Sequence, residues 1–315
     1  DIFLKELLRN GTTTALVFGS VHPQSVDALF EAAQRLDLRL IAGKVMMDRN
    51  APDYLTDTAE SGYNDSKALI ERWHGQGRLH YAVTPRFAPT STPEQLTLAG
   101  KLLSEYPDVY LHTHISENLQ EIEWVKSLFP ERKGYLDVYD HYQLLGERSV
   151  FAHGVHLCDE ECARLAETGS AVAFCPTSNL FLGSGLFNLP MAEKHKLNVG
   201  LGTDVGAGTS FSLLNTLNEA YKVMQLQGAR LNPFKSLYLA TLGGARALRL
   251  EDKIGTLKPG TDADFVVLDY NATPLMSYRL QQSKDIADTL FVLMTLGDDR
   301  TVEQTYAAGN LVHQR

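Results

Sequence analysis

The segment HTHISEN, residues 112–118, carries two histidines and a glutamate. His112 and His114 are one residue apart, so on a β-strand their side chains point to the same face. A neutral imidazole is a good metal ligand, and Glu117 follows His114 closely enough to share its pocket as a proton carrier. The segment could therefore supply a metal-binding pair, or one ligand with a bystander beside it. The alternative is a surface loop in which the glutamate caps a helix.

Two more segments place metal-like side chains after predicted strands. AHG contributes His153, and GTD contributes Asp204. Groups at the carboxyl ends of different parallel strands converge on one face of a barrel, so these two can join the side chains of HTHISEN. Histidine and aspartate together suit Zn²⁺ or Fe²⁺ with a position left for water. Asp204 could instead be a buried turn carboxylate, because glycines surround it.

Arg86 and Phe87, in the segment TPRFAPT, follow another predicted strand. A planar guanidinium beside an aromatic ring suits a flat heterocycle that bears a carbonyl, because one donates hydrogen bonds and the other stacks. The alternative is an arginine on the rim and a phenylalanine in the core. These two residues are candidates for substrate binding.

Short runs rich in β-branched residues alternate with amphipathic segments, which is typical of β/α units and a mainly parallel sheet. Seven runs predict strands, over residues 12–18, 38–46, 79–87, 109–116, 149–154, 170–176 and 198–204. Helices are predicted between them, among others over 25–36, 93–106 and 160–169. Polar residues follow nearly every strand, as at the active-site end of a barrel. We therefore expect an α/β fold, a (β/α)8 TIM-type barrel lacking its first strand in this chain; a seven-stranded open sheet is the alternative.

The pattern changes after residue 250. Residues 253–270 are Gly/Pro turns followed by valines, and residues 302–314 form a second β element. We place a barrel, with strands 2–8 of eight, at residues 1–250. Residues 251–315 are predicted to form the C-terminal portion of a small β domain and the final helices. The chain begins at Asp1 without a leading strand, so we expect the first strand to precede it.

Composition excludes several classes of protein. The net charge of -9 argues against a surface for nucleic acid or anionic membrane, and no apolar run reaches the ~18 residues of a membrane span. Three cysteines are too few for a disulfide framework and indicate a reducing, cytoplasmic setting. Cys158 and Cys162 lie near His153, but the acidic residues 159–161 are typical of a helix start rather than of a metal cluster.

A series of motifs extends over essentially the whole chain. In order they are TPRFAPT, HTHISEN, FAHG, FCPTSNLFLGSG, GLGTDVGAGTS, LATLGGARAL, IGTLKPGTDADFVVLD and LGDDR. Together they resemble the guanine deaminases of the amidohydrolase superfamily. TPRF and LGDDR point to the guanine deaminases, whereas HIS, AHG and GTD mark the superfamily more broadly.

The resemblance implies that residues 1–250 are a metal-dependent hydrolase, a (β/α)8 barrel that holds one zinc ion per subunit, with iron as the alternative. It implies that His114 and Asp204 bind the metal, together with an H-x-H at the end of the first barrel strand. This chain contains no such H-x-H before residue 12. On this resemblance HTHISEN is the fifth strand, where one ligand is expected, so His112 should pack deeper in the barrel. The sequence thus predicts an N-terminally truncated chain that could be inactive by itself.

The resemblance also implies the reaction, which is hydrolytic deamination of guanine to xanthine and ammonia. Glu117, His153 and Asp204 would be catalytic. The substrate would contact six residues, which are Arg86, Phe87, His114, Glu117, His153 and Asp204. It further implies that the protein binds a small purine base and forms a homodimer. As the net charge already indicated, neither nucleic acid nor a membrane is expected as a partner. Two alternatives are a related aminohydrolase acting on another purine or a triazine, and a non-catalytic barrel protein without a complete metal site.

Overall fold

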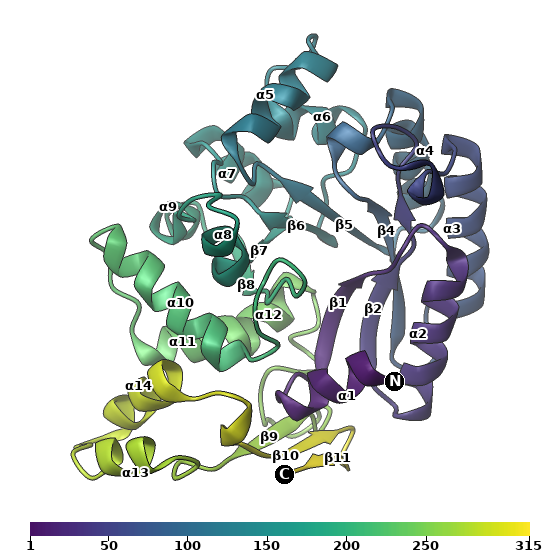
Figure 1. The fold of residues 1–315 in the computed structure, drawn as a ribbon. Coiled ribbons are helices and arrows are strands. Elements are labelled where there is room, and N and C mark those ends of the chain that lie inside the picture. The colour runs from purple at the N-terminus through teal and green to yellow at the C-terminus, as the bar shows by residue number, and fades with distance from the viewer. The chain divides into compact units, whose positions relative to one another are not determined.

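The computed structural model describes residues 1–315 (Figure 1). The chain forms two compact units. Unit 1 comprises Asp1–Thr13, Ala173–Lys194 and Asn198–Arg315, and unit 2 comprises Thr14–Val172 and His195–Leu197. Unit 1 is discontinuous in sequence, because the first residues of the chain belong to the same unit as the C-terminal part. No helix combines the length and the apolar character needed to span a membrane.

Unit 2 contains parallel strands in the order β1-β2-β4-β5-β6, with the short β3 beside β4. Their bounds are Thr14–Phe18 (β1), Arg39–Gly43 (β2), Val45–Met46 (β3), Leu79–Pro85 (β4), Tyr110–Ile115 (β5) and Ser149–His153 (β6). Every residue of β2 and β6 is buried, as is usual for parallel strands covered on both faces.

Helices connect these strands, and Figure 1 shows α2, α3 and α4 along one side of β2 and β4. The helices of unit 2 are α2 (Pro23–Arg35), α3 (Ala59–Trp73), α4 (Pro93–Glu105), α5 (Leu119–Leu128), α6 (Tyr135–His141) and α7 (Asp159–Glu167), with short 3₁₀ turns η1 (Asp53–Leu55) and η2 (Ala88–Thr90). Side chains before α3, α4 and α5 cap them: Thr58, Thr92 and Asn118 each accept a hydrogen bond from the first turn.

Strand β7 (Ala171–Phe174) begins in unit 2 and ends in unit 1, where the Gly202 N–H donates to the Phe174 carbonyl at 2.9 Å just beyond β8 (Asn198–Leu201). A separate antiparallel sheet has the order β11-β10-β9. The remaining elements of unit 1 are α1 (Ile2–Arg9), α8 (Pro176–Phe181), α9 (Leu189–Lys194), α10 (Leu213–Leu226), α11 (Pro233–Ala240), α12 (Leu242–Ala247), β9 (Phe265–Leu268), α13 (Pro274–Leu280), α14 (Ile286–Leu296), η3 (Asp299–Thr301), β10 (Val302–Ala307) and β11 (Asn310–Gln314).

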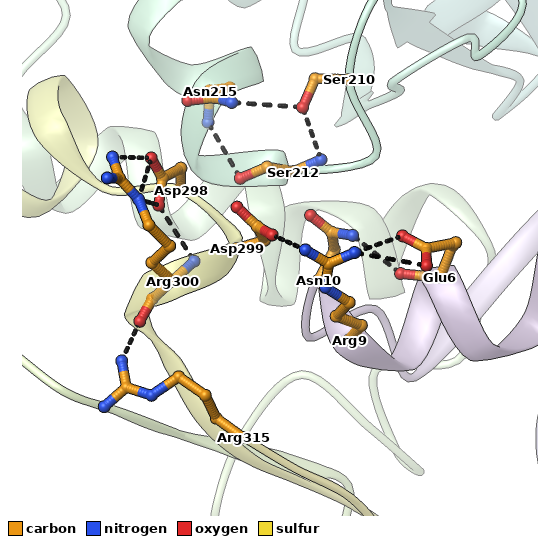
Figure 2. A network of polar contacts seen from close by, with 10 residues as sticks. All are labelled: Glu6, Arg9, Asn10, Ser210, Ser212, Asn215, Asp298, Asp299, Arg300 and Arg315. Carbon is orange, nitrogen blue, oxygen red and sulfur yellow. Dashed lines mark hydrogen bonds and ion pairs between the residues drawn. The ribbon is translucent and has the colours of Figure 1, made fainter. Parts of the chain in front are cut away.

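Polar contacts join the first helix to the C-terminal sheet of unit 1. The Thr305 hydroxyl donates to the Leu8 carbonyl at 2.7 Å. Figure 2 shows the Arg9 guanidinium between two carboxylates. Its Nη1 lies 3.3 Å from Oε2 of Glu6, and its Nη2 forms an ion pair with Asp299. These contacts are the physical reason that residues at opposite ends of the sequence fall into one unit.

The predicted α/β fold with a mainly parallel sheet and a small additional β element is confirmed. Each of the seven predicted strands coincides with a strand of the structure. The predicted strand 38–46 is divided at Lys44 into β2 and β3, and helix α7 begins at Asp159, as its acidic residues predicted. The division of the chain at residue 250 stays a prediction.

Candidate functional site

The ends of β5 and β6 bring two histidine rings together in unit 2. The centroids of His114 and His153 are 5.3 Å apart, and the ring planes differ by 19°. The strand register places Ile115 opposite His153. His153 is 1% exposed and has a φ of 73°, in the left-handed region where a residue with a side chain is strained. Such strain, held at the end of a buried strand, is typical of functional positions.

Glu117 faces the second of these histidines. Its Oε2 lies 3.6 Å from Nε2 of His153, and its side chain is 16% exposed. The helix cap after this segment is supplied by other residues: Asn118 accepts from the Glu121 N–H, and Glu121 Oε2 accepts from the N–H groups of Glu117 and Asn118. Glu117 is therefore not the helix-capping carboxylate of the alternative interpretation, and its carboxyl group is directed to His153.

The imidazole of His114 is in the state that a metal ligand requires. Burial, and secondarily the neighbouring His153, lowers the pKa of His114 well below its usual value, so the ring is neutral. Nδ1 lies 2.6 Å from the Arg86 carbonyl, which can only accept, so Nδ1 carries the proton. The Nε2 lone pair is then available for a metal, an arrangement typical of metal-binding histidines.

His112 has a different environment. It is 6% exposed, and its ring centroid lies 3.8 Å from that of Phe18. Burial lowers the pKa of His112 to about 3, so this ring is also neutral. Phe18 also stacks on His114, at 4.6 Å. The structure therefore places His112 in the packed interior, as expected, with an aromatic neighbour that the motif analysis did not identify.

Arg86 and Phe87 follow β4 directly. The Arg86 guanidinium carbon lies 4.7 Å from the centroid of the Phe87 ring. Arg86 is exposed and Phe87 is partly buried, so the phenylalanine is not a core residue. The Phe87 ring makes edge-to-face contacts with Trp124 of α5 and with His114, at ring-centroid distances of 6.1 Å and 6.4 Å. The pair thus lies beside the histidine cluster, and Trp124 is a site neighbour that sequence motifs missed.

Asp204 belongs to unit 1 and follows β8. Its φ is 49°, in the left-handed region, and its carbonyl accepts from the N–H groups of Gly206 and Ala207, both at 3.1 Å. Its backbone therefore forms the tight turn that the glycine-rich sequence indicated. Whether its carboxylate binds a metal stays a proposal.

The donor set fits a metal only in part. No group of three or more His, Cys, Asp or Glu side chains is arranged to hold a metal ion, and the three cysteines are free thiols. Catalytic zinc sites usually have three protein ligands and an open position. The His114 ring is neutral and its Nε2 lone pair is available, so His114 fits as one ligand of such a site.

The comparisons with known proteins agree with these features. The model of the amidohydrolase family matches residues 1–312. A curated guanine deaminase from Escherichia coli (strain K12) is 64% identical over 313 residues, which is 99% of this chain and 71% of that protein. The guanine deaminase of Rattus norvegicus is 38% identical over 321 residues, 98% of this chain and 70% of that protein.

Solved structures give the same assignment. The E. coli guanine deaminase structure superposes with a TM-score of 0.99 at 64% identity, over 100% of this chain and 74% of that one. A guanine deaminase from C. acetobutylicum with bound guanine has a TM-score of 0.91 at 30% identity, over 99% of this chain and 74% of that one. The resemblance predicted from the motifs is confirmed: this chain belongs to the amidohydrolase family, in its guanine deaminase branch.

Proposed function

We propose that this protein catalyses the hydrolytic deamination of guanine to xanthine and ammonia. The observation that carries the proposal is the placement of Arg86 and Phe87 beside His114, with Glu117 and His153 next to them. Arg86 and Phe87 suit the binding of an oxopurine, and Glu117 and His153 suit proton transfer. The relative from C. acetobutylicum was solved with guanine in its active site, which supports the same substrate here.

Arg86 and Phe87 would bind the base. The guanidinium is exposed and can donate hydrogen bonds to the O6 carbonyl of guanine, and the Phe87 ring can stack on the purine. Trp124 packs edge-to-face with the Phe87 ring and adds a second aromatic neighbour to the binding residues. This arrangement favours a flat ring with a carbonyl over a purine that has an amine at the same position.

Glu117 would move the protons. It would take one proton from the attacking water and deliver it to the ring nitrogen, as a general base and then acid. It would then take the second proton of that water, from the hydroxyl now on C2, and deliver it to the amine, so that the C2–N bond breaks, ammonia leaves and the C2 carbonyl forms. His153, 3.6 Å from Glu117, would orient the water together with Asp204. The burial of His153 keeps bulk water from competing for this contact.

His114 and Asp204 would hold a zinc ion, with iron as the alternative. When bound, the metal lowers the pKa of its water to about 7 and so supplies hydroxide at neutral pH. The neutral state of His114 and the hydrogen bond to its Nδ1 support its role as a ligand. Metal content, measured on the purified protein, tests this assignment independently of turnover.

A substrate panel tests the function. The purified natural protein, loaded with zinc, is incubated with guanine, adenine, an oxidised guanine and an aminotriazine, and xanthine formation and ammonia release are measured. We expect guanine to have a kcat/KM at least about 100-fold above adenine, because a site built to bind a carbonyl rejects an analogue that lacks it. If the zinc-loaded protein released no xanthine from guanine, the proposal would be wrong; preference for a triazine would favour the related aminohydrolase.

The cytoplasmic location and the homodimer predicted from sequence remain proposals. The three free thiols are consistent with a reducing compartment. Light scattering after size-exclusion chromatography would measure the mass of the assembly, and a monomer would contradict the dimer.

A further inference from the structure

The hydroxyl of Tyr139 connects the two segments that present the candidate substrate and metal residues. Tyr139 lies on α6 and is fully buried. Its O–H donates to the His114 carbonyl at 2.8 Å and accepts from the Ala88 N–H at 3.0 Å. It also lies 3.2 Å from the Thr113 hydroxyl. One phenol thus contacts both the end of β5 and the segment that follows β4.

Both backbone groups are adjacent to the proposed chemistry. Ala88 follows Phe87 directly and is itself fully buried, so its N–H has no access to water. The His114 carbonyl belongs to the same residue whose ring nitrogen contacts the Arg86 carbonyl. The contacts therefore run in a closed circuit, from Tyr139 to His114, from His114 to Arg86, and along the chain to Ala88. A shift of the hydroxyl would move both sides of the site.

Aromatic packing of the Tyr139 ring holds its hydroxyl in place. The Tyr139 ring lies 5.6 Å from Phe151 of β6 and 5.5 Å from Tyr135, one turn earlier on α6. Burial raises the pKa of Tyr139 well above its usual value, so the phenol stays protonated and keeps its donor. A tyrosine required only to fill space would not have three polar partners within 3.2 Å of its hydroxyl.

We propose that Tyr139 is a positioning residue for guanine binding, which acts through its hydroxyl on the Arg86–Phe87 segment and on His114. The proposal rests on the function proposed above. It predicts that losing one oxygen atom, with the ring retained, displaces Phe87 and Arg86 relative to the histidine cluster. The residue touches neither substrate nor metal, and its effect is transmitted through two backbone hydrogen bonds.

The test uses Tyr139→Phe, with Tyr135→Phe as the matched control. Both tyrosines are buried on the same helix, but the Tyr135 hydroxyl interacts only with the side chains of Glu121 and Tyr139 and forms no hydrogen bond to the backbone. For Tyr139→Phe we expect kcat/KM for guanine to fall about 10- to 100-fold, because misplacement of a binding group by roughly 1 Å has such an effect. Most of this loss should be a rise in KM. The control should keep the KM of the unmodified protein.

A purely structural role would give a different result. It would lower the melting temperature and the active fraction in both variants and leave KM unchanged, and that outcome would overturn the proposal. Hydrogen exchange gives a readout that does not depend on turnover. In the unmodified protein the Ala88 amide should exchange slowly, and in Tyr139→Phe its protection should fall at least about tenfold while segments remote from residues 86–90 are unaffected.

The two proposals can fail separately. If the unmodified protein does not deaminate guanine, the proposed function is wrong, and the exchange of the Ala88 amide still decides whether Tyr139 holds this segment. If the unmodified protein is active but its Ala88 amide exchanges rapidly, the positioning role is wrong. This second measurement needs no variant, so the inference can be refuted even if Tyr139→Phe does not fold.

Discussion

A buried ion pair next to the TPRF segment allows a quantitative prediction for the variant Lys44→Met. Lys44 lies between β2 and β3, is fully buried, and its ammonium pairs with Asp57. The ammonium also donates to the Val45 carbonyl at 3.3 Å. The Asp57 carboxyl accepts from the Met47 N–H at 3.1 Å and from the Gln95 amide at 2.9 Å. Removing Lys44 therefore leaves a carboxylate that is buried and held by neutral donors alone.

The expected loss of stability is large. Removing one partner of a buried ion pair costs about 3–5 kcal/mol in the free energy of unfolding, because the remaining charge is uncompensated. For a domain of 150–250 residues, each kcal/mol lowers the melting temperature by about 2–4 °C, so we expect a decrease of roughly 6–20 °C. The exposed pair of Lys126 and Glu123 supplies a control, since Lys126→Met should leave the melting temperature almost unchanged.

The pH dependence distinguishes this explanation from a simple packing defect. Burial raises the pKa of Asp57 above its usual value, and the charge and hydrogen bond of Lys44 oppose that rise. Without Lys44 the pKa of Asp57 must rise further. A carboxyl with a raised pKa binds more protons in the folded than in the unfolded protein, so stability falls as the pH rises above the unfolded value of about 4. The deficit of Lys44→Met should therefore be smallest near that pH and largest at neutral pH.

The assay is urea or thermal unfolding of the variant and the unmodified protein across this pH range. The difference between the two proteins cancels the titration of all other groups. In the double variant Lys44→Met/Asp57→Asn the titrating carboxyl is gone, so the deficit should lose its pH dependence and become smaller. A deficit of Lys44→Met that is constant with pH, or smaller than about 1 kcal/mol at neutral pH, would refute the reasoning about the uncompensated charge.

Four further substitutions concern the candidate site. Glu117→Gln should lower kcat for guanine about 10²- to 10⁴-fold with unchanged metal content, because it removes the proton carrier; normal turnover would disprove that role. Arg86→Met should mainly raise KM and weaken the preference for guanine over adenine, and an unchanged ratio of kcat/KM would contradict its contact with O6. His112→Phe should keep both metal and turnover within a few-fold, because His112 is a neutral packing residue against Phe18. His114→Ala should lose metal by elemental analysis; equal effects of the two substitutions would show that the ligand is assigned wrongly.

Much of the fold could be predicted because it depends on local patterns. Strands β5 and β6 are short, buried and bounded by polar residues, so their apolar runs identify them. The residues at their ends follow from the rule that parallel strands present their carboxyl ends on one side. Helix α7 was predicted from acidic residues that suit a helix start. These features need no knowledge of which distant segments touch.

Other features depend on contacts between distant residues, and no pattern in the sequence announces them. Tyr139 is one of two tyrosines in the short helix α6, and its partners Thr113 and Ala88 lie 26 and 51 residues away. The same holds for Trp124 on α5, whose ring packs against Phe87 although α4 and β5 lie between them in the sequence. The joining of α1 to the C-terminal sheet also requires pairing between the two ends of the chain. Local propensity contains no information about such partners.

The position of the substrate residues explains why so many distant groups contact them. Strand β4 ends at Pro85, so Arg86 and Phe87 lie beyond the last residue of the strand. Their backbone is held instead by separate contacts: the Arg86 N–H donates to the Met46 carbonyl at 3.2 Å, the Arg86 carbonyl accepts from His114, and the N–H of Ala88, directly after Phe87, donates to the Tyr139 hydroxyl. Each contact comes from a different element, so the placement of the guanidinium and the ring depends on all of them together. It follows that substrate preference in this protein should respond to substitutions in β3 and α6 as well as to changes at Arg86 and Phe87 themselves.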